Sequence, residues 1–127
     1  MEKKPKILVV DDDVDLVQVV SQILRSKLYD VIVAYNGKDG LQKAKDEKPD
    51  LIIMDILMPV MDGFGASDEF KKDAALSGIP IIALTSFSMS LGQPFETKFD
   101  EYVVKPVRPK ALLEIVGKHL KRIGFDV

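Results

Sequence analysis

The sequence predicts an α/β domain in which helices cover both faces of a parallel β-sheet. Short apolar runs rich in β-branched residues recur along the 127-residue chain, as expected for strands that are buried on both faces. Segments with apolar residues at helical spacing lie between these runs. This alternation is typical of βα units joined by right-handed crossovers, and it predicts five of them. The predicted strands are 7–10, 31–35, 51–54, 79–84 and 102–104.

The first two predicted helices each follow a strand. Residues 16–24 place apolar side chains on one helical face, directly after the first strand. Asn36-Gly37 precede a second helix from about Lys38 to Glu47, which Pro49-Asp50 end.

The second half of the chain continues the alternation with one irregular segment. A third helix opens at Asp62-Gly63 and reaches roughly Ala75. Residues 86–98 contain glycine, proline and serines, which predict an irregular loop to about Gln93 followed by a short helix. Apolar positions within 112–120 predict the last helix.

The composition excludes several classes of function. Because the chain has no cysteine, it cannot form disulfides, zinc fingers or iron–sulfur sites. Its one histidine, His119, rules out a multi-histidine metal site, and we expect an exposed side chain near the end of the last helix. The formal net charge of −2 offers no basic footprint for nucleic acid. No apolar run approaches the ~20 residues that cross a bilayer, so we expect a cytoplasmic protein.

Polar residues with complementary chemistry follow four of the predicted strands. Fourteen of the 20 acidic residues are aspartates, and four of these lie within positions 11–15. Because the carboxyl ends of parallel strands meet at one edge of the sheet, where ligands bind in such folds, we expect the polar residues to share one crevice. They are Asp11, Asp12, Asp13, Asp55, Thr85 and Lys105.

This set suits the chemistry of phosphate. Clustered carboxylates repel each other and need a compensating cation, and a few partly hydrated oxygen ligands suit Mg²⁺. Lys105 and the metal would attract an anion, and a carboxylate that attacks phosphorus forms an acyl phosphate. Asp55, the one acid at the end of an apolar strand, is the best candidate nucleophile. Asp13 and Asp15 fit instead the acidic start of a helix.

Four segments in order resemble the receiver domain of two-component response regulators. The resemblance covers about residues 6–120 and implies a flavodoxin-like, doubly wound three-layer sandwich. It implies five parallel strands in the order 2-1-3-4-5 with five flanking helices, the fourth short or irregular. We expect residues 1–127 to form this one domain without an output domain. The segments are ILVVDDD (7–13), LIIMDILMPVMDG (51–63), IPIIALTS (79–86) and YVVKP (102–106).

The resemblance also assigns roles to the strand-end residues. Asp55 would be the phosphoacceptor, and Lys105 would pair with the phosphoryl group. Asp12 and Asp55 would bind Mg²⁺ directly, together with the backbone carbonyl of Leu57. Asp11 would bind the metal through a water molecule.

Further roles concern switching and lifetime. Thr85 would hydrogen-bond the phosphoryl group, and Tyr102 matches the family's switch aromatic, whose rotamer follows the threonine. The family often has a cis peptide before Pro106. Leu57 and Phe87 lie two positions after Asp55 and Thr85; both are apolar and cannot orient an attacking water, so we expect slow hydrolysis of the phosphoaspartate.

The implied function is that of a stand-alone response regulator receiver. A histidine kinase or histidine phosphotransfer protein would donate the phosphoryl group, and the surface of the fourth helix, fifth strand and fifth helix would change. The domain would catalyse only its own phosphorylation and dephosphorylation. It would signal to another protein as a monomer or weak dimer, without binding nucleic acid or membrane. The donor would dock on residues beside the site: Val14, Asp15, Gln18, Pro106 and Val107.

Two alternatives remain open at this point. Asp11, Asp13 and Val14 also match the opening motif of haloacid-dehalogenase-like phosphatases, in which Asp11 would be the nucleophile. No acidic pair follows Lys105, as that fold would require. The second alternative is a pseudo-receiver that acts only as an interaction module, and the intact acid, hydroxyl and lysine set argues against it.

Overall fold

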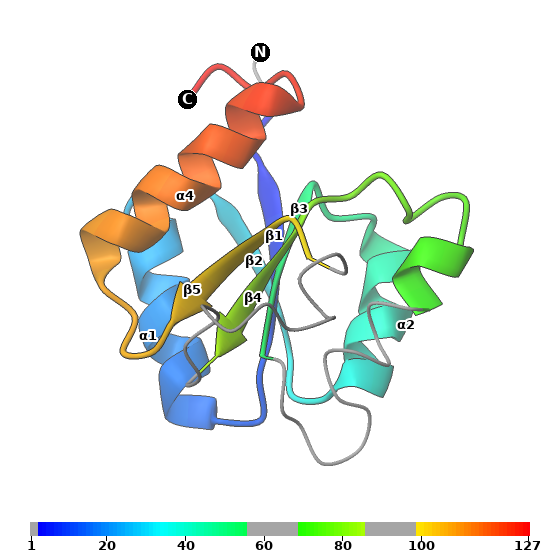
Figure 1. The fold of residues 1–127 in the computed structure, drawn as a ribbon, viewed down its shortest axis with the longest axis horizontal. Coiled ribbons are helices and arrows are strands. Elements are labelled where there is room, and N and C mark those ends of the chain that lie inside the picture. Colours follow the sequence, from blue (N-terminus) through cyan, green and yellow to red (C-terminus); the bar gives the residue numbers. More distant parts are fainter. Residues whose placement is uncertain (1–2, 56–68, 86–98) are drawn as a thin grey trace, which may run out of the picture.

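The computed structural model contains one parallel sheet with helices on both faces, and it describes residues 3–55, 69–85 and 99–127 (Figure 1). The strand order is β2-β1-β3-β4-β5, as the resemblance implied. Every neighbouring pair is parallel, with β1 hydrogen-bonded to both β2 and β3. The strands are β1 (Lys6–Val10), β2 (Asp30–Ala34), β3 (Leu51–Asp55), β4 (Ile81–Thr85) and β5 (Glu101–Val104).

The helices α1 (Val14–Arg25), α2 (Gly37–Glu47) and α4 (Pro109–Arg122) divide between the two faces of the sheet (Figure 1). Successive strand residues point to opposite faces, so each strand supplies both halves of the core. Ile7 and Val9 pack with residues of α1 and α4, whereas Leu8 and Val10 pack with α2 and Phe70. The near-continuous apolar strands of the sequence therefore bury both faces.

Side-chain caps fix where the first two helices begin. Asp13 Oδ1 accepts a hydrogen bond from the backbone N–H of Leu16 at 3.2 Å, and Asn36 Oδ1 accepts one from Asp39 at 2.8 Å. Such caps satisfy backbone donors that the first helical turn leaves unpaired. The Asp13 cap confirms the expected helix start and leaves Asp11 and Asp12 in the short connection after β1.

The fourth strand begins at Ile81, two residues later than predicted. The backbone N–H of Ile79 donates to Leu76 in the preceding turn, at 3.0 Å, and Pro80 has no N–H to give to a strand. The carbonyl of Pro80 still accepts from Ile52 N, at 2.9 Å. Local turn bonds thus shorten a run that is apolar throughout.

Two predicted helical segments are described only in part or not at all. Within the predicted third helix, residues 69–72 are helical and the chain turns after them. The start of that helix and the irregular segment 86–98 lie outside the described residues. None of the described helices has the length and apolar content that a membrane span requires.

The expectation that His119 is exposed is wrong, because its side chain is buried with 6% of its surface accessible. His119 lies three residues after Val116, which belongs to the apolar stripe of α4. Its Nδ1 lies 3.1 Å from Arg122 Nη2. Arginine can only donate, so Nδ1 is the acceptor and the imidazole is neutral with its proton on Nε2.

Candidate functional site

Asp11 begins the site at the carboxyl end of β1. Its backbone N–H donates to Ala34 of β2 at 3.1 Å, and its Oδ1 accepts from the backbone N–H of Asp13 at 2.9 Å. These bonds fix a side chain that is only 1% exposed. Asp12, the next residue, is exposed.

Asp55 ends β3, one strand away from Asp11. All five residues of β3 are buried, and Asp55 itself is 7% exposed. One carboxylate oxygen from each of Asp11, Asp12 and Asp55 lies within 4.8 Å of the others. The sheet therefore brings Asp55 close to Asp11 and Asp12, which lie 44 and 43 positions before it in the sequence.

Lys105 supplies the positive charge in the site. Its Nζ lies 3.4 Å from Asp11 Oδ2 and 3.5 Å from Asp55 Oδ1, so one ammonium bridges both buried acids. The backbone N–H of Lys105 donates to Thr85 at 2.7 Å, which ties the end of β5 to the end of β4. The peptide bond before Pro106 is cis, as the resemblance suggested.

The electrostatics of this cluster leave negative charge uncompensated. Burial raises the pKa of Asp11 from 3.8 to about 6; the N–H of Asp13 opposes this rise, Asp55 adds to it, and Lys105 opposes it. Three carboxylates face one ammonium. Asp11 Oδ2 is buried and, apart from the Lys105 ion pair, has no hydrogen-bond partner among the described residues.

A divalent cation fits this donor set. Carboxylate oxygens are the ligands that Mg²⁺ prefers, and Mg²⁺ keeps several waters and uses few protein ligands. Asp11, Asp12 and Asp55 could hold it at the open edge of the sheet, where Asp12 is exposed to solvent. The positive charge of such an ion would offset the acids that Lys105 leaves unbalanced.

Thr85 and Tyr102 lie on the same face of the sheet. Thr85 ends β4 beside Asp55, because Leu84 pairs with Asp55 in the register, and its side chain is 2% exposed. By the alternation of strand residues, Thr85 shares a face with Ala83, and Tyr102 packs on the same half of the core. The ring of Tyr102 meets Phe99 edge to face, with centroids 5.8 Å apart.

The structure describes the five predicted docking residues but not the two residues expected to set the phosphoryl lifetime. Val14 is 49% exposed at the first position of α1, followed on that helix by exposed Asp15 and Gln18. Pro106 is exposed and Val107 is half-buried in the connection after β5. Leu57 and Phe87 lie outside the described residues.

Sequence reasoning missed Gly40, which lets α2 pack closely on β1. A Cβ atom at Gly40 would lie 2.8 Å from Val10 Cγ2, closer than side chains normally approach. Val10 is the last strand residue before Asp11, so this packing supports the connection that carries the acids. The available signal was a glycine inside a predicted helix, which usually has a packing reason.

The family model described as response regulator receiver domain matches residues 7–117. The chain belongs to this family. Its members are signalling domains rather than enzymes of the usual kind, and they receive phosphoryl groups from histidine kinases.

Longer regulators contain similar sequences. The chain is 37% identical over 123 residues to "Probable transcriptional regulator ycf27" of Porphyridium aerugineum, covering 95% of this chain and 50% of that protein. It is 33% identical over 123 residues to "DNA-binding response regulator MtrA" of Mycolicibacterium paratuberculosis, with 94% and 52% covered. The chain thus spans about half the length of these relatives.

Solved structures agree with the fold. Chemotaxis protein CheY4 of Vibrio cholerae superposes with a TM-score of 0.84 at 31% identity, covering 93% of this chain and all of that one. A CheY-like receiver domain of Methanospirillum hungatei gives 0.86 at 30% identity, with 94% and 96% covered. The receiver domain of sensor histidine kinase PA1611 of Pseudomonas aeruginosa gives 0.81 at 27% identity, with 94% and 99% covered; that structure has magnesium in its active-site cleft.

Proposed function

We propose that this receiver domain accepts a phosphoryl group on Asp55 from a histidine kinase or a histidine phosphotransfer protein. The observation that carries the proposal is the position of Lys105, whose Nζ lies within 3.5 Å of the Asp55 carboxylate and also contacts Asp11. A buried carboxylate with a fixed ammonium beside it can receive an anion whose charge is neutralised on arrival.

The transfer step balances as a substitution at phosphorus. A carboxylate oxygen of Asp55 forms a bond to phosphorus, the bond from phosphorus to the donor's imidazole nitrogen breaks, and that nitrogen takes up a proton. Lys105 stabilises the negative charge that develops on the phosphoryl oxygens, and the hydroxyl of Thr85 can donate a hydrogen bond to them. Asp11, Asp12 and Asp55 would hold Mg²⁺, which supplies further charge neutralisation at the same oxygens.

Phosphorylation would redistribute the contacts of Lys105. In the unphosphorylated domain the ammonium is shared between Asp11 and Asp55. A phosphoryl group carries more negative charge than the carboxylate it modifies and would draw the ammonium away from Asp11. We expect Thr85 to move toward the phosphoryl oxygens at the same time, with Tyr102 following on the same face, so that the surface around β5 changes by a population shift.

The direct test measures phosphorylation by acetyl phosphate with intact-mass spectrometry. Wild-type protein with Mg²⁺ should gain one phosphoryl group, and chelation with EDTA should prevent this. Asp55→Asn should abolish labelling, whereas Asp46→Asn, at an exposed position of α2, should label normally.

Two results would contradict the proposal. Labelling that survives Asp55→Asn and is lost in Asp11→Asn would identify Asp11 as the nucleophile of a phosphatase-like reaction. Failure of the wild-type protein to take label and to bind beryllofluoride with Mg²⁺ would mark a pseudo-receiver.

A further inference from the structure

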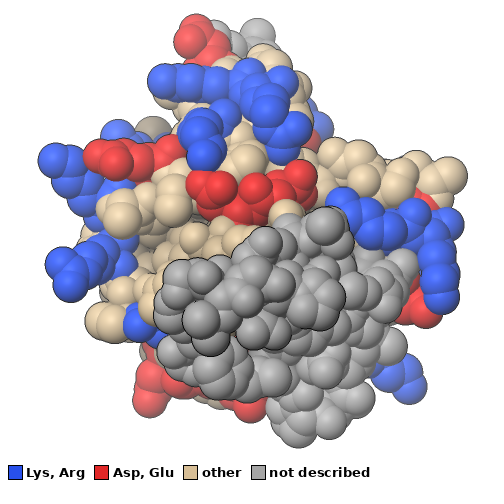
Figure 2. All heavy atoms as spheres, viewed as in Figure 1, with Lys and Arg blue, Asp and Glu red and all other residues tan. Residues whose placement is uncertain are grey.

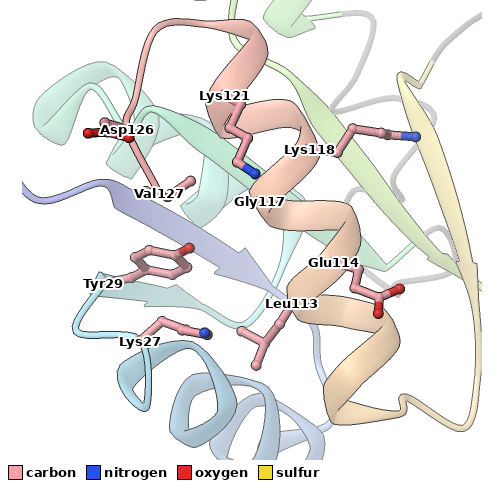
Figure 3. Close-up of a pocket in the computed structure, with 9 residues that line it drawn as sticks. All are labelled: Lys27, Tyr29, Leu113, Glu114, Gly117, Lys118, Lys121, Asp126 and Val127. Atoms are coloured by element: carbon pink, nitrogen blue, oxygen red, sulfur yellow. The ribbon is translucent and has the colours of Figure 1, made fainter.

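A hollow on the protein surface lies away from the carboxylate site. It has a volume of about 670 Å³ and lies between α4 and the chain that connects α1 to β2 (Figure 3). We call it the α4 groove, lined by Lys27, Tyr29, Leu113, Gly117, Lys121 and Val127. Tyr29 directly precedes β2, so the α4 groove opens at the amino-terminal edge of the sheet, opposite to Asp55.

The floor of the α4 groove is apolar and allows close approach. Tyr29 belongs to the buried core, and Leu113 packs partly against it. Gly117 lies inside α4 and faces the groove, and a Cβ atom there would meet nothing within 4 Å. Glycine weakens a helix interior, and no neighbour within the described part of the chain accounts for its small size. A binding partner that contacts the helix backbone would account for a glycine at this position.

Leu28, beside the same groove, has an unfavourable backbone conformation and an exposed apolar side chain. It adopts φ of 64°, a left-handed conformation that favours glycine or asparagine, at the end of α1. Leu28 is 71% exposed and lines a smaller hollow of about 440 Å³, which shares Lys27, Tyr29, Asp126 and Val127 with the α4 groove. A strained and exposed leucine is unfavourable in the isolated domain, and contact with an apolar partner would offset this.

The rim of the α4 groove carries three lysines, Lys27, Lys118 and Lys121, against two acids, and the hollows beside it add further lysines. Three connected hollows, including one of about 430 Å³, carry many lysines and only two acidic side chains, Glu114 and Asp126. Among the described residues, neither Lys27 nor Lys121 has an acid within ion-pair distance, whereas Lys118 pairs with Glu101 at 2.7 Å. In Figure 2, Lys and Arg side chains gather over the upper part of the view, where Figure 1 places α4.

We infer that the α4 groove binds an acidic amphipathic helix of a partner protein. The apolar face of that helix would lie on Tyr29, Leu113 and the backbone at Gly117, with Leu28 against its side. Its acidic residues would meet Lys27 and Lys121, whose charges face the groove in Figure 3. A flat lipid surface would not reach the floor of a concave groove. The inference does not depend on phosphorylation of Asp55.

The test uses the full chain and a designed probe. The probe is a fluorescent helical peptide of about 18 residues, long enough to be helical, with leucines on one face and glutamates elsewhere. A second peptide has glutamine in place of every glutamate. Fluorescence anisotropy gives affinities, and amide chemical shifts locate the bound peptide.

We expect the glutamate peptide to bind more tightly than the glutamine peptide and to shift the amides of Leu28 and Gly117. Gly117→Leu, which fills the groove, should weaken binding about tenfold or more. Leu28→Asn should also weaken binding while raising the melting temperature, because asparagine tolerates the left-handed conformation. Lys121→Glu should reduce affinity, whereas Lys71→Glu, an exposed control outside the groove, should not.

The same measurements distinguish a partner helix from a membrane surface or a second copy of the chain in the α4 groove. Equal affinity of wild type and Gly117→Leu for the peptide would overturn the inference. So would binding to phosphatidylserine vesicles without binding to the peptide. Self-association that Gly117→Leu abolishes, again without peptide binding, would show that the groove receives a second copy of the chain.

Discussion

Replacing Asp11 with asparagine should stabilise the metal-free domain at neutral pH. In the fold, burial and the nearby Asp55 carboxylate raise the pKa of Asp11 from 3.8 to about 6, against the opposing effects of the Asp13 N–H and Lys105. The difference between these values corresponds to about 3 kcal/mol of unfolding free energy at pH above 6. Asparagine keeps the oxygen that accepts from Asp13, so most of this gain should be observed.

The gain in stability from Asp11→Asn should grow as pH rises. Between pH 3.8 and about 6 the native state holds a proton on Asp11 that the unfolded state has lost, so this group lowers stability as pH rises through that window. The advantage of Asp11→Asn should therefore be small near pH 4 and largest above pH ~6.

The assay is urea denaturation in EDTA, followed by circular dichroism at several pH values. Asp12→Asn is the matched control, because Asp12 is exposed and its replacement should change stability by less than about 0.5 kcal/mol. Added Mg²⁺ should stabilise the wild type more than Asp11→Asn, by mass action. An Asp11→Asn variant no more stable than wild type at pH 7.5, or equally stabilised at pH 4, would show that the charged Asp11 carboxylate does not destabilise the fold.

Three further predictions concern other parts of the molecule. Burial, and secondarily Arg122, lower the pKa of His119 below 6.5, so His119 makes the fold less stable as pH falls through 6.5. The melting temperature of His119→Leu should therefore fall less than that of the wild type between about pH 7 and 5. An equal fall in both proteins would contradict this prediction. Gly40→Ala should lower the free energy of unfolding by about 1–3 kcal/mol, because the added Cβ atom clashes with Val10. In a double-mutant cycle, Val10→Ala should relieve part of this loss. Additive effects of the two substitutions would exclude the clash. Because Leu57 and Phe87 are apolar, phosphorylated protein with Mg²⁺ should keep its label well beyond seconds, and loss of label within seconds would disprove slow hydrolysis.

Protonation of the buried His119 should disturb the charged residues around it. Glu101 at the start of β5 pairs with Lys118, and the adjacent Asp100 lies 3.8 Å from Arg122, which in turn contacts His119. A proton on Nδ1 would remove the acceptor that Arg122 uses. The effect should be largest where α4 meets the start of β5.

Local sequence patterns were sufficient to locate the five strands, α1, α2 and α4, and the polar residues at the strand ends. Apolar runs and helical spacing are properties of neighbouring residues, so β3 and α1 could be located from the chain alone. Asp55 and Lys105 could be assigned to one edge because a parallel sheet places the ends of its strands together. The alternating βα pattern indicated the fold class, and the joint motifs indicated the strand order.

Features that depend on contacts between distant parts of the chain could not be predicted from local sequence patterns. Whether His119 is buried depends on how α4 packs in the folded domain, and its position near the helix end suggested the opposite. That one ammonium, Lys105, reaches both Asp11 and Asp55 depends on three strand ends meeting within a few ångströms. The α4 groove likewise exists because Tyr29 and Gly117, 88 positions apart, line one hollow. Burial and concavity are properties of packed surfaces, and local sequence patterns do not encode which surfaces will meet.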